Sequence, residues 1–210
     1  MLGLMQDHPL LISSIFEHAV SNYGKQEIVS NTVEGGIHRY NYSSWGKRTK
    51  KLANALKTLN LEQGDKVGTL AWNGYRHLEI YYATSSSGLI CHTLNPRLHP
   101  DQVSYIVNHA EDKVLCVDLN ILPLIEKASE NFKSVKAIVI MTDEKNMVKP
   151  KIKDGIKVIC YEDFIKDQSD DFVWPQLDEK TASSLCYTSG TTGNPKGVLY
   201  SHRSTVLHAY

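Results

Sequence analysis

An alternation of short apolar runs with helical periods begins near Gly64 and continues to Lys166, and it constrains the fold more than any other feature of the sequence. The apolar runs suit buried strands, and the segments between them carry apolar residues at about every third or fourth position, as amphipathic helices do. Strands that alternate with helices favour parallel pairing, because a parallel pair needs a long crossover. The pattern predicts an α/β fold with a parallel-rich sheet flanked by helices.

The elements expected in this part follow one another along the chain. Strands are predicted at residues 66–72, 89–94, 113–117, 135–141, 157–161 and 183–187. Helices are predicted at residues 75–87, 100–109, 121–132 and 162–166. The polar stretch that follows, 167–180, is expected to be a packed connector.

The N-terminal part has a different pattern. Apolar residues at helical spacing predict an amphipathic helix over residues 10–23, which Gly24 is placed to end. Two short strand-like segments joined by a glycine turn come next, and then a second helix. We therefore expect a helix-hairpin-helix region over residues 1–62 and an α/β subdomain over residues 63–210.

The second helix is expected to begin at Ser43 or Ser44, whose hydroxyl can cap the first turn. One face of this helix is basic. No aromatic residues interleave its cations, so we interpret the face as solvated rather than as a surface for nucleic acid or membrane. The basic residues are Lys47, Arg48, Lys50, Lys51 and Lys57.

Composition excludes several classes of protein. The chain has 210 residues, of which 41% are hydrophobic and 22% charged, in the range of globular domains. Lys and Arg total 23, as do Asp and Glu, so no basic field predicts nucleic-acid binding. No apolar stretch approaches the roughly 18 residues of a membrane span, and the N-terminus lacks the basic region of a signal peptide. A soluble, cytoplasmic protein is expected.

The cysteines and histidines give no metal-ligand pattern. Each cysteine lies in an apolar run without a C-x-x-C spacing, so all four are expected to be reduced core residues. These are Cys91, Cys116, Cys160 and Cys186. His92, His99 and His109 lack the helical pairing of zinc enzymes and are weak evidence for a metal site.

The most specific local feature is the stretch Thr188 to Gly197, which is rich in glycine and hydroxyl residues and contains Lys196. Glycines let backbone N–H groups approach a ligand, hydroxyls add neutral donors, and the lysine adds a cation, so the stretch has the parts of a phosphate cradle. It differs from a Walker P-loop, because Gly197 follows the lysine and a strand, not a helix, follows Gly197. A polar hairpin loop is the plain alternative.

At these residues the sequence resembles the adenylate-forming superfamily, which includes acyl-CoA synthetases, luciferases and the adenylation domains of peptide synthetases. The phosphate-loop signature of that superfamily is [ST]-[ST]-G-[ST]-[ST]-G-x-P-K-G, and Thr188 to Gly197 matches it throughout. Residues 198–203 also resemble the segment that follows the signature. The resemblance implies that the chain forms an incomplete N-terminal part of the adenylate-forming enzyme fold.

The resemblance implies a two-step ligation in which a carboxylic acid reacts with ATP to give an acyl-adenylate, which then passes its acyl group to coenzyme A. It assigns Lys196 a catalytic role in stabilising phosphoryl charge and assigns Thr188 to Mg²⁺. The residues implied in binding the ATP phosphates are Thr188, Ser189, Gly190, Thr191, Thr192, Gly193, Lys196 and Gly197. His202 could lie near the active site or could be a packing or capping residue.

Segments near residues 76–79, 91–98 and 105–110 are similar to medium-chain fatty acyl-CoA synthetases and methylthiopropionate-activating enzymes. Later motifs of the superfamily are absent from the sequence, so we expect an inactive N-terminal fragment of a fatty acyl-CoA synthetase. A homodimer is possible for the intact enzyme. Amino-acid or aryl-acid adenylation and a stand-alone phosphate-binding module are the alternatives.

The resemblance also places the partner of residues 1–62 in a sheet beyond the phosphate loop. We therefore expect residues 1–62 to be less securely held than residues 63–210.

Overall fold

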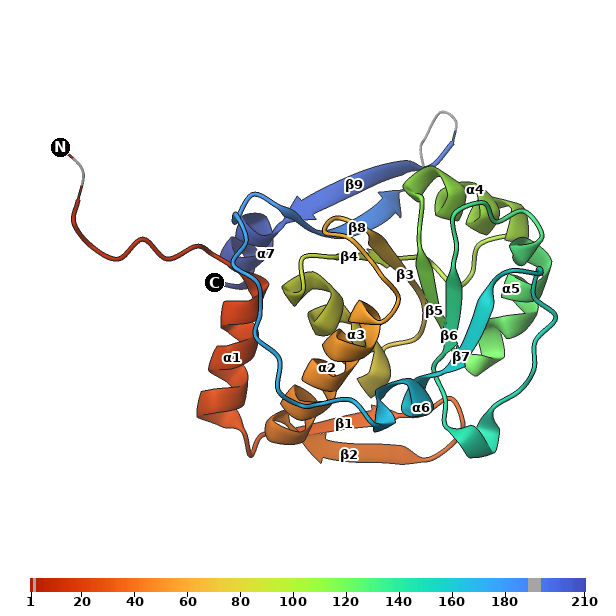
Figure 1. The fold of residues 1–210 in the computed structure, drawn as a ribbon, viewed down its shortest axis with the longest axis horizontal. Coiled ribbons are helices and arrows are strands. Elements are labelled where there is room, and N and C mark those ends of the chain that lie inside the picture. The colour runs from red at the N-terminus through yellow and green to blue at the C-terminus, as the bar shows by residue number, and fades with distance from the viewer. Residues whose placement is uncertain (2, 189–193) are drawn as a thin grey trace.

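The computed structural model describes residues 1, 3–188 and 194–210. A seven-stranded sheet forms its centre, in the order β7-β6-β5-β3-β4-β8-β9 (Figure 1). All pairs in this sheet are parallel except β8 with β9. The strands are β3 (Lys66–Leu70), β4 (Ile90–Thr93), β5 (Val114–Val117), β6 (Ala137–Ile140), β7 (Lys157–Cys160), β8 (Ala182–Thr188) and β9 (Lys196–Ser201). The predicted α/β fold with a parallel-rich sheet is confirmed.

Helices connect the parallel strands and cover both faces of the sheet (Figure 1). The chain leaves β3 for β4 on one side and then crosses back over β3 to reach β5, so the direction of winding reverses at β3. The connecting helices are α3 (Tyr75–Ser86), α4 (Pro100–Ala110) and α5 (Leu122–Ser129), and α6 (Tyr161–Lys166) follows β7. Short 3₁₀ turns span Leu119–Ile121 and Glu144–Asn146.

The N-terminal elements pack onto one face of this sheet. They are α1 (Ile12–Tyr23), β1 (Glu27–Asn31), β2 (Ile37–Asn41) and α2 (Tyr42–Lys57). Phe16 and Leu52 lie in one apolar core with Ile80 of α3 and Val67 of β3. Phe16 is fully buried and packs edge-on against Trp45, with the ring centroids 4.8 Å apart. The apolar faces of α1 and α2 are therefore covered within this chain.

The antiparallel hairpin of β1 and β2 is less well covered. Val29 is 49% exposed and Ile37 is 65% exposed, and the two strands pair only with each other. Gly35 and Gly36, with φ of 96° and 97°, turn the chain between them in a conformation that favours glycine. The division at residue 62 stays a prediction, but the structure distinguishes buried helices from an exposed hairpin inside the first region.

The prediction was right about the end of α1 and wrong about the cap of α2. Gly24 ends α1 as expected, with a right-handed φ of −51°; a side chain there would place Cβ 2.4 Å from Oγ of Ser43. Asn41, rather than Ser43 or Ser44, caps α2 by accepting a hydrogen bond from the N–H of Ser44. The glycine is needed for a close approach, and the cap lies two residues before the first serine considered.

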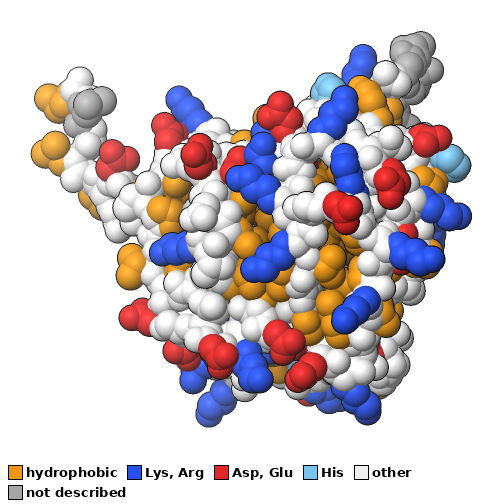
Figure 2. Space-filling model, turned by 45° about the vertical axis from the view of Figure 1, so that its right-hand side comes forward, with side chains coloured by type: hydrophobic (Ala, Val, Ile, Leu, Met, Phe, Trp, Pro, Cys, Tyr) orange, Lys and Arg blue, Asp and Glu red, His pale blue; other side chains and the backbone are white. Residues whose placement is uncertain are grey.

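A second apolar core lies on the other face, under α4 and α5. It includes Ile106, Leu115, Ile125 and Ile138, all at most 2% exposed. On the surface, basic and acidic side chains are interspersed over the face in Figure 2, in keeping with their equal numbers. In the part of the chain that the structure describes, no helix is long and apolar enough to cross a membrane.

The cysteines occupy the positions expected of core residues in three cases of four. Cys91, Cys116 and Cys160 are buried, whereas Cys186 in β8 is only partly buried. All four are free thiols. Burial raises the pKa of Cys91 and Cys116, the latter to about 12, so these two are protonated packing residues at neutral pH.

Candidate functional site

The candidate site lies at one edge of the sheet, where β8 turns into β9 (Figure 1). The antiparallel register places Thr188, the last residue of β8, opposite Lys196, the first residue of β9. Both side chains are exposed. The structure therefore brings together the two ends of the predicted phosphate loop.

The middle of the loop lies outside the described residues. Five predicted phosphate-binding residues belong to this group: Ser189, Gly190, Thr191, Thr192 and Gly193. Their proposed contacts with phosphate stay predictions from the sequence, as do those of the two described ends.

Gly197 lies at a close contact across the hairpin. It pairs with Tyr187, and a Cβ at position 197 would lie 3.1 Å from the ring of Tyr187 and 3.2 Å from the side chain of Leu185. A larger residue would require the side chains of Tyr187 and Leu185 to move by a few tenths of an ångström. The glycine thus contributes to the shape of the hairpin as well as to the signature.

Lys196 forms no ion pair with any residue that the structure describes. An exposed ammonium group without an anionic neighbour keeps its charge available for a ligand. Thr188 offers one hydroxyl at the same end of the hairpin. One hydroxyl is a suitable single ligand for Mg²⁺, which takes most of its oxygen ligands from water and phosphates.

The strand that leads into the loop is anchored to α4. The Tyr187 hydroxyl lies 2.6 Å from Nδ1 of His109, and partial burial raises the pKa of this tyrosine. The His109 ring also stacks on Tyr105, with the centroids 5.5 Å apart. Local sequence patterns do not indicate this contact, because residues 109 and 187 are 78 positions apart in the chain.

A buried pair lies beneath this strand. His92 of β4 is fully buried, and its Nδ1 lies 2.8 Å from the carboxylate of Asp112. Burial raises the pKa of Asp112, although the hydrogen bond to His92 opposes the change. Nε2 of His92 has no hydrogen-bond partner among the described residues.

The three histidines considered as metal ligands have separate roles. His92 pairs with Asp112, His109 contacts Tyr187, and His99 caps α4 by accepting a hydrogen bond from the N–H of Asp101. No cluster of three or more His, Cys, Asp or Glu side chains suited to a metal ion occurs in residues 1, 3–188 and 194–210.

His202 begins α7 (His202–Ala209), at the end of β9 opposite to Lys196. Its ring is fully buried, and Nδ1 accepts a hydrogen bond from the N–H of Ile12, the first residue of α1. Burial lowers the pKa of this histidine. Of the two roles open from the sequence, the structure shows packing and helix capping.

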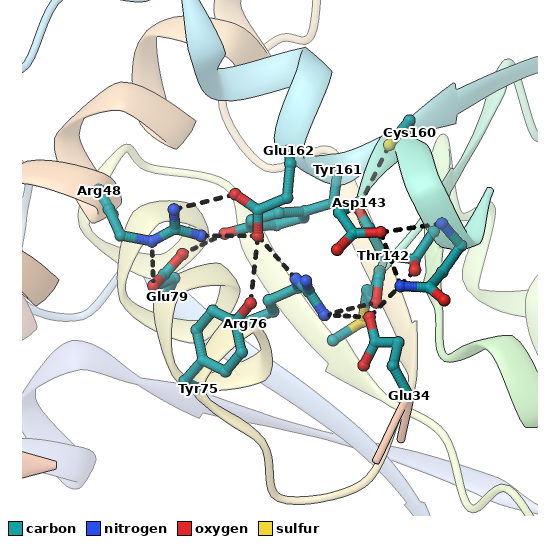
Figure 3. Close-up of polar contacts among 12 residues, drawn as sticks. Glu34, Arg48, Tyr75, Arg76, Glu79, Thr142, Asp143, Cys160, Tyr161 and Glu162 are labelled. Carbon is teal, nitrogen blue, oxygen red and sulfur yellow. Dashed lines mark hydrogen bonds and ion pairs between the residues drawn. The ribbon is translucent and has the colours of Figure 1, made fainter. Parts of the chain in front are cut away.

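A cluster of charged side chains, mostly shielded from solvent, lies between α2, α3 and α6 (Figure 3). Nε of Arg48 donates to Glu79 at 2.8 Å, and Nη1 donates to Glu162 at 2.9 Å. Arg76 contacts Glu162 through Nε at 2.8 Å and Glu34 through Nη1 at 2.7 Å. The cluster ties the hairpin of β1 and β2 to the body of the fold.

Arg48 was wrongly placed on a solvated helix face. Its side chain is only 25% exposed, because Glu79 and Glu162 draw it inward. Glu79 is fully buried and also accepts a hydrogen bond from the Tyr161 hydroxyl at 2.6 Å. Burial would raise the pKa of Glu162, but hydrogen bonds from the two arginines outweigh it and lower that pKa.

Comparison with known proteins identifies the class. The model of the AMP-binding enzyme family matches residues 16–210, and the chain belongs to this family, within the adenylate-forming superfamily. The described structure is similar to that of the anthranilate CoA ligase AuaEII in complex with anthranoyl-AMP, with a TM-score of 0.79 and 25% identity over 95% of this chain and 37% of that one. A putative long-chain-fatty-acid CoA ligase from Rhodopseudomonas palustris shares the fold, with a TM-score of 0.77 and 18% identity over 97% of this chain and 49% of that one.

Two curated relatives are more similar in sequence. The chain is 49% identical to a 3-methylmercaptopropionyl-CoA ligase of Ruegeria lacuscaerulensis over 214 aligned residues, and 47% identical to a medium-chain-fatty-acid–CoA ligase of Ectopseudomonas oleovorans over 209. Both alignments cover 100% of this chain and 38% of the relative. The chain thus spans about 38% of the length of these curated relatives.

Proposed function

We propose that this chain is the N-terminal part of an AMP-forming acid–CoA ligase that acts on a fatty acid, most suitably one of medium chain length. The observation that supports this proposal most strongly is the signature Thr188 to Gly197. Near its two ends, Thr188 of β8 and Lys196 of β9 face each other at an exposed edge of the sheet. The similarity to ligases of medium-chain fatty and methylthio acids supports the substrate class.

In the proposed reaction the acid carboxylate attacks the α-phosphate of ATP, pyrophosphate leaves, and the thiol of coenzyme A then takes the acyl group. The reaction needs no protein nucleophile, so the protein must position the reactants and stabilise charge. Lys196 would bind the β- and γ-phosphates with the loop hydroxyls and N–H groups. Mg²⁺, bound with help from Thr188, would offset the charge of the leaving pyrophosphate.

Phosphate binding by this chain alone provides the first test. Calorimetric titration with pyrophosphate should show binding, and Lys196→Ala should weaken it. Lys157→Ala is a matched control, because Lys157 is the first residue of β7 at the opposite edge of the sheet and is also exposed. Equal affinity in both variants would remove Lys196 from the phosphate site.

Turnover separates the proposal from a stand-alone binding module. We expect no acid-dependent exchange of pyrophosphate into ATP from this chain alone, because the resemblance to the superfamily implies that the groups that bind the acid and the ribose belong to later motifs. The longer protein should catalyse this exchange. An amino acid or aryl acid that supports exchange better than a fatty acid would favour the alternative adenylating enzymes.

A further inference from the structure

A hollow separate from the β8–β9 hairpin lies at the carboxyl ends of three parallel strands. Trp72 and Arg76 follow the end of β3, Asp118 directly follows β5, and Met141 directly follows β6; all four line the hollow. Its volume is about 360 Å³, and the turn of the β1–β2 hairpin closes one side.

The strand order indicates that a ligand site is expected at this position. The chain winds from β3 to β4 and then from β4 across to β5, so the crevice between the ends of β3 and β5 is the point where the winding reverses. In open α/β sheets, ligands bind outside the carboxyl ends of the strands at such a point, because the loops diverge there and leave a crevice. The fold itself thus predicts a ligand site at this hollow.

Two charged side chains that line the hollow are held in place by hydrogen bonds, but each has an atom that forms no hydrogen bond to a described residue. Arg76 is 8% exposed and is held through Nε and Nη1, while its Nη2 forms no hydrogen bond to a described residue. Asp118 is 6% exposed; Oδ2 accepts from the N–H of Trp72 at 2.7 Å, and Oδ1 has no partner in the described chain. A rigid donor and a rigid acceptor therefore line the same hollow.

Charge and shape restrict the ligand. Asp118 and Glu34 are both acidic, and the charge of Arg76 is already opposed by Glu34 and Glu162, so an anion gains little in this hollow. The N-terminus of α3, which lacks a side-chain cap, adds a partial positive charge that partly offsets the two carboxylates and reduces the gain for a cation. Trp72 is 40% exposed and offers an aromatic surface, and the guanidinium of Arg97 lies 5.8 Å from the centroid of its ring. Hydroxyl groups could both donate to Asp118 and accept from Arg76.

We propose that the hollow bounded by Trp72, Arg76 and Asp118 binds a small neutral molecule that carries an aromatic ring and neighbouring hydroxyl groups, such as a nucleoside. The ring stacks on the indole of Trp72, and the hydroxyl groups bind Asp118 and Arg76. Neither Thr188 nor Lys196 lines the hollow, so this site is distinct from the described ends of the phosphate loop.

Tryptophan fluorescence during titration with adenosine tests the proposal. Trp45 and Trp174 are 3% and 9% exposed, so a saturable quench would report on Trp72. The quench should disappear in Trp72→Phe, while calorimetry should still detect binding to that variant. No saturable quench and no calorimetric binding of adenosine by the unmodified chain would overturn the proposal.

Variants of Asp118 and of the ligand test the polar contacts. Asp118→Asn can still accept from the Trp72 N–H but loses the negative charge, and should weaken adenosine binding by about tenfold, as for a hydrogen bond to a charged group. Asp170→Asn, at an exposed position, is the matched control and should have no effect. Thermal unfolding of each variant checks the fold. Unchanged affinity in a folded Asp118→Asn would contradict the assigned site.

A nucleoside without the ribose hydroxyl groups at C2′ and C3′ tests the proposed hydroxyl contacts, and a variant of the phosphate loop tests whether the two sites are separate. 2′,3′-Dideoxyadenosine should bind more weakly than adenosine, and equal binding would contradict the hydroxyl contacts. Lys196→Ala should leave adenosine affinity unchanged while it weakens pyrophosphate binding. The adenosine measurements test the proposed hollow and the pyrophosphate measurements test the phosphate loop, so either proposal can fail without the other.

Discussion

Two regions of this molecule use basic side chains in opposite ways. Arg48 of α2 and Arg76 of α3 are shielded from solvent, and each contacts two glutamates. Lys196, at the β8–β9 edge, is exposed and pairs with no acid in the described part of the chain. A cation whose charge is matched within the fold holds elements together, whereas an exposed cation without a partner can bind an anionic ligand.

The largest expected effect on stability comes from breaking the buried cluster. Glu79→Ala leaves Arg48 and the Tyr161 hydroxyl without a fully buried partner, and should lower the free energy of unfolding by about 3–5 kcal/mol. Denaturant unfolding monitored by circular dichroism measures the change.

The exposed pair Arg39–Glu27 provides a matched control for this loss. Both side chains are more than half exposed, so Glu27→Ala should cost only about 0–1 kcal/mol. Similar losses for the two variants would show that burial does not distinguish the two ion pairs.

Removing the exposed cation of Lys196 should weaken ligand binding but leave stability nearly unchanged. Lys196→Ala should change the free energy of unfolding by no more than about 0.5 kcal/mol, because the side chain has no partner to lose. Its affinity for pyrophosphate should fall by about tenfold or more, as for a hydrogen bond to a charged group. Calorimetry and denaturant unfolding on the same samples measure both quantities, and a large loss of stability would give Lys196 a structural role.

Lowering the pH should weaken the buried ion cluster and so lower the free energy of unfolding. The pKa of Glu162 is lowered in the folded state, so its stabilising contribution is present above the unfolded pKa of about 4.3 and is lost as pH falls through the folded pKa. Glu162→Gln should therefore flatten the dependence of stability on pH below about 4.3. Unfolding curves at several pH values, compared with those of Glu27→Gln, measure the effect; equal slopes would contradict it.

His202 should give a smaller pH effect at a higher range. Burial lowers its folded pKa, so the unfolded state binds more protons as pH falls below about 6.5, and stability decreases. His202→Asn keeps an acceptor for the N–H of Ile12 but cannot titrate, and should reduce this loss. Stability measured from pH 7 to 5 tests it; an unchanged slope would remove His202 as its source.

Hydrogen exchange should refine the expected difference between residues 1–62 and 63–210. Phe16 and Leu52 share a core with Ile80, so amides of α1 and α2 should be protected with the sheet. The exposed hairpin of β1 and β2 should exchange faster, and fast exchange throughout α1 and α2 would show that the shared core does not hold them.

Much of the architecture could be predicted from the sequence, because periodicity and turn residues are local signals. The order of elements from β3 to β9 followed from apolar runs, and the signature marked the β8–β9 hairpin. The ion cluster could not be predicted in this way. Glu162 is 114 residues from Arg48, and only the tertiary fold brings the two together.

Local rules also failed where tertiary contacts compete with them. Asn41 takes the cap position that Ser43 or Ser44 was expected to fill, whereas Gly24 ends α1 as expected. In the candidate site, the signature located Thr188 and Lys196. It gave no indication of the contact between Tyr187 and His109, whose residues are 78 positions apart.

We propose above all that the loop between β8 and β9, which contains the signature Thr188 to Gly197, binds the phosphates of ATP in an acid-activating ligase. Exchange of labelled pyrophosphate into ATP by the longer protein, with and without a medium-chain fatty acid, tests it most directly. We predict exchange that depends on the acid and slows strongly in Lys196→Ala but not in Lys157→Ala. Exchange that is independent of the acid, or unchanged in Lys196→Ala, would contradict the claim.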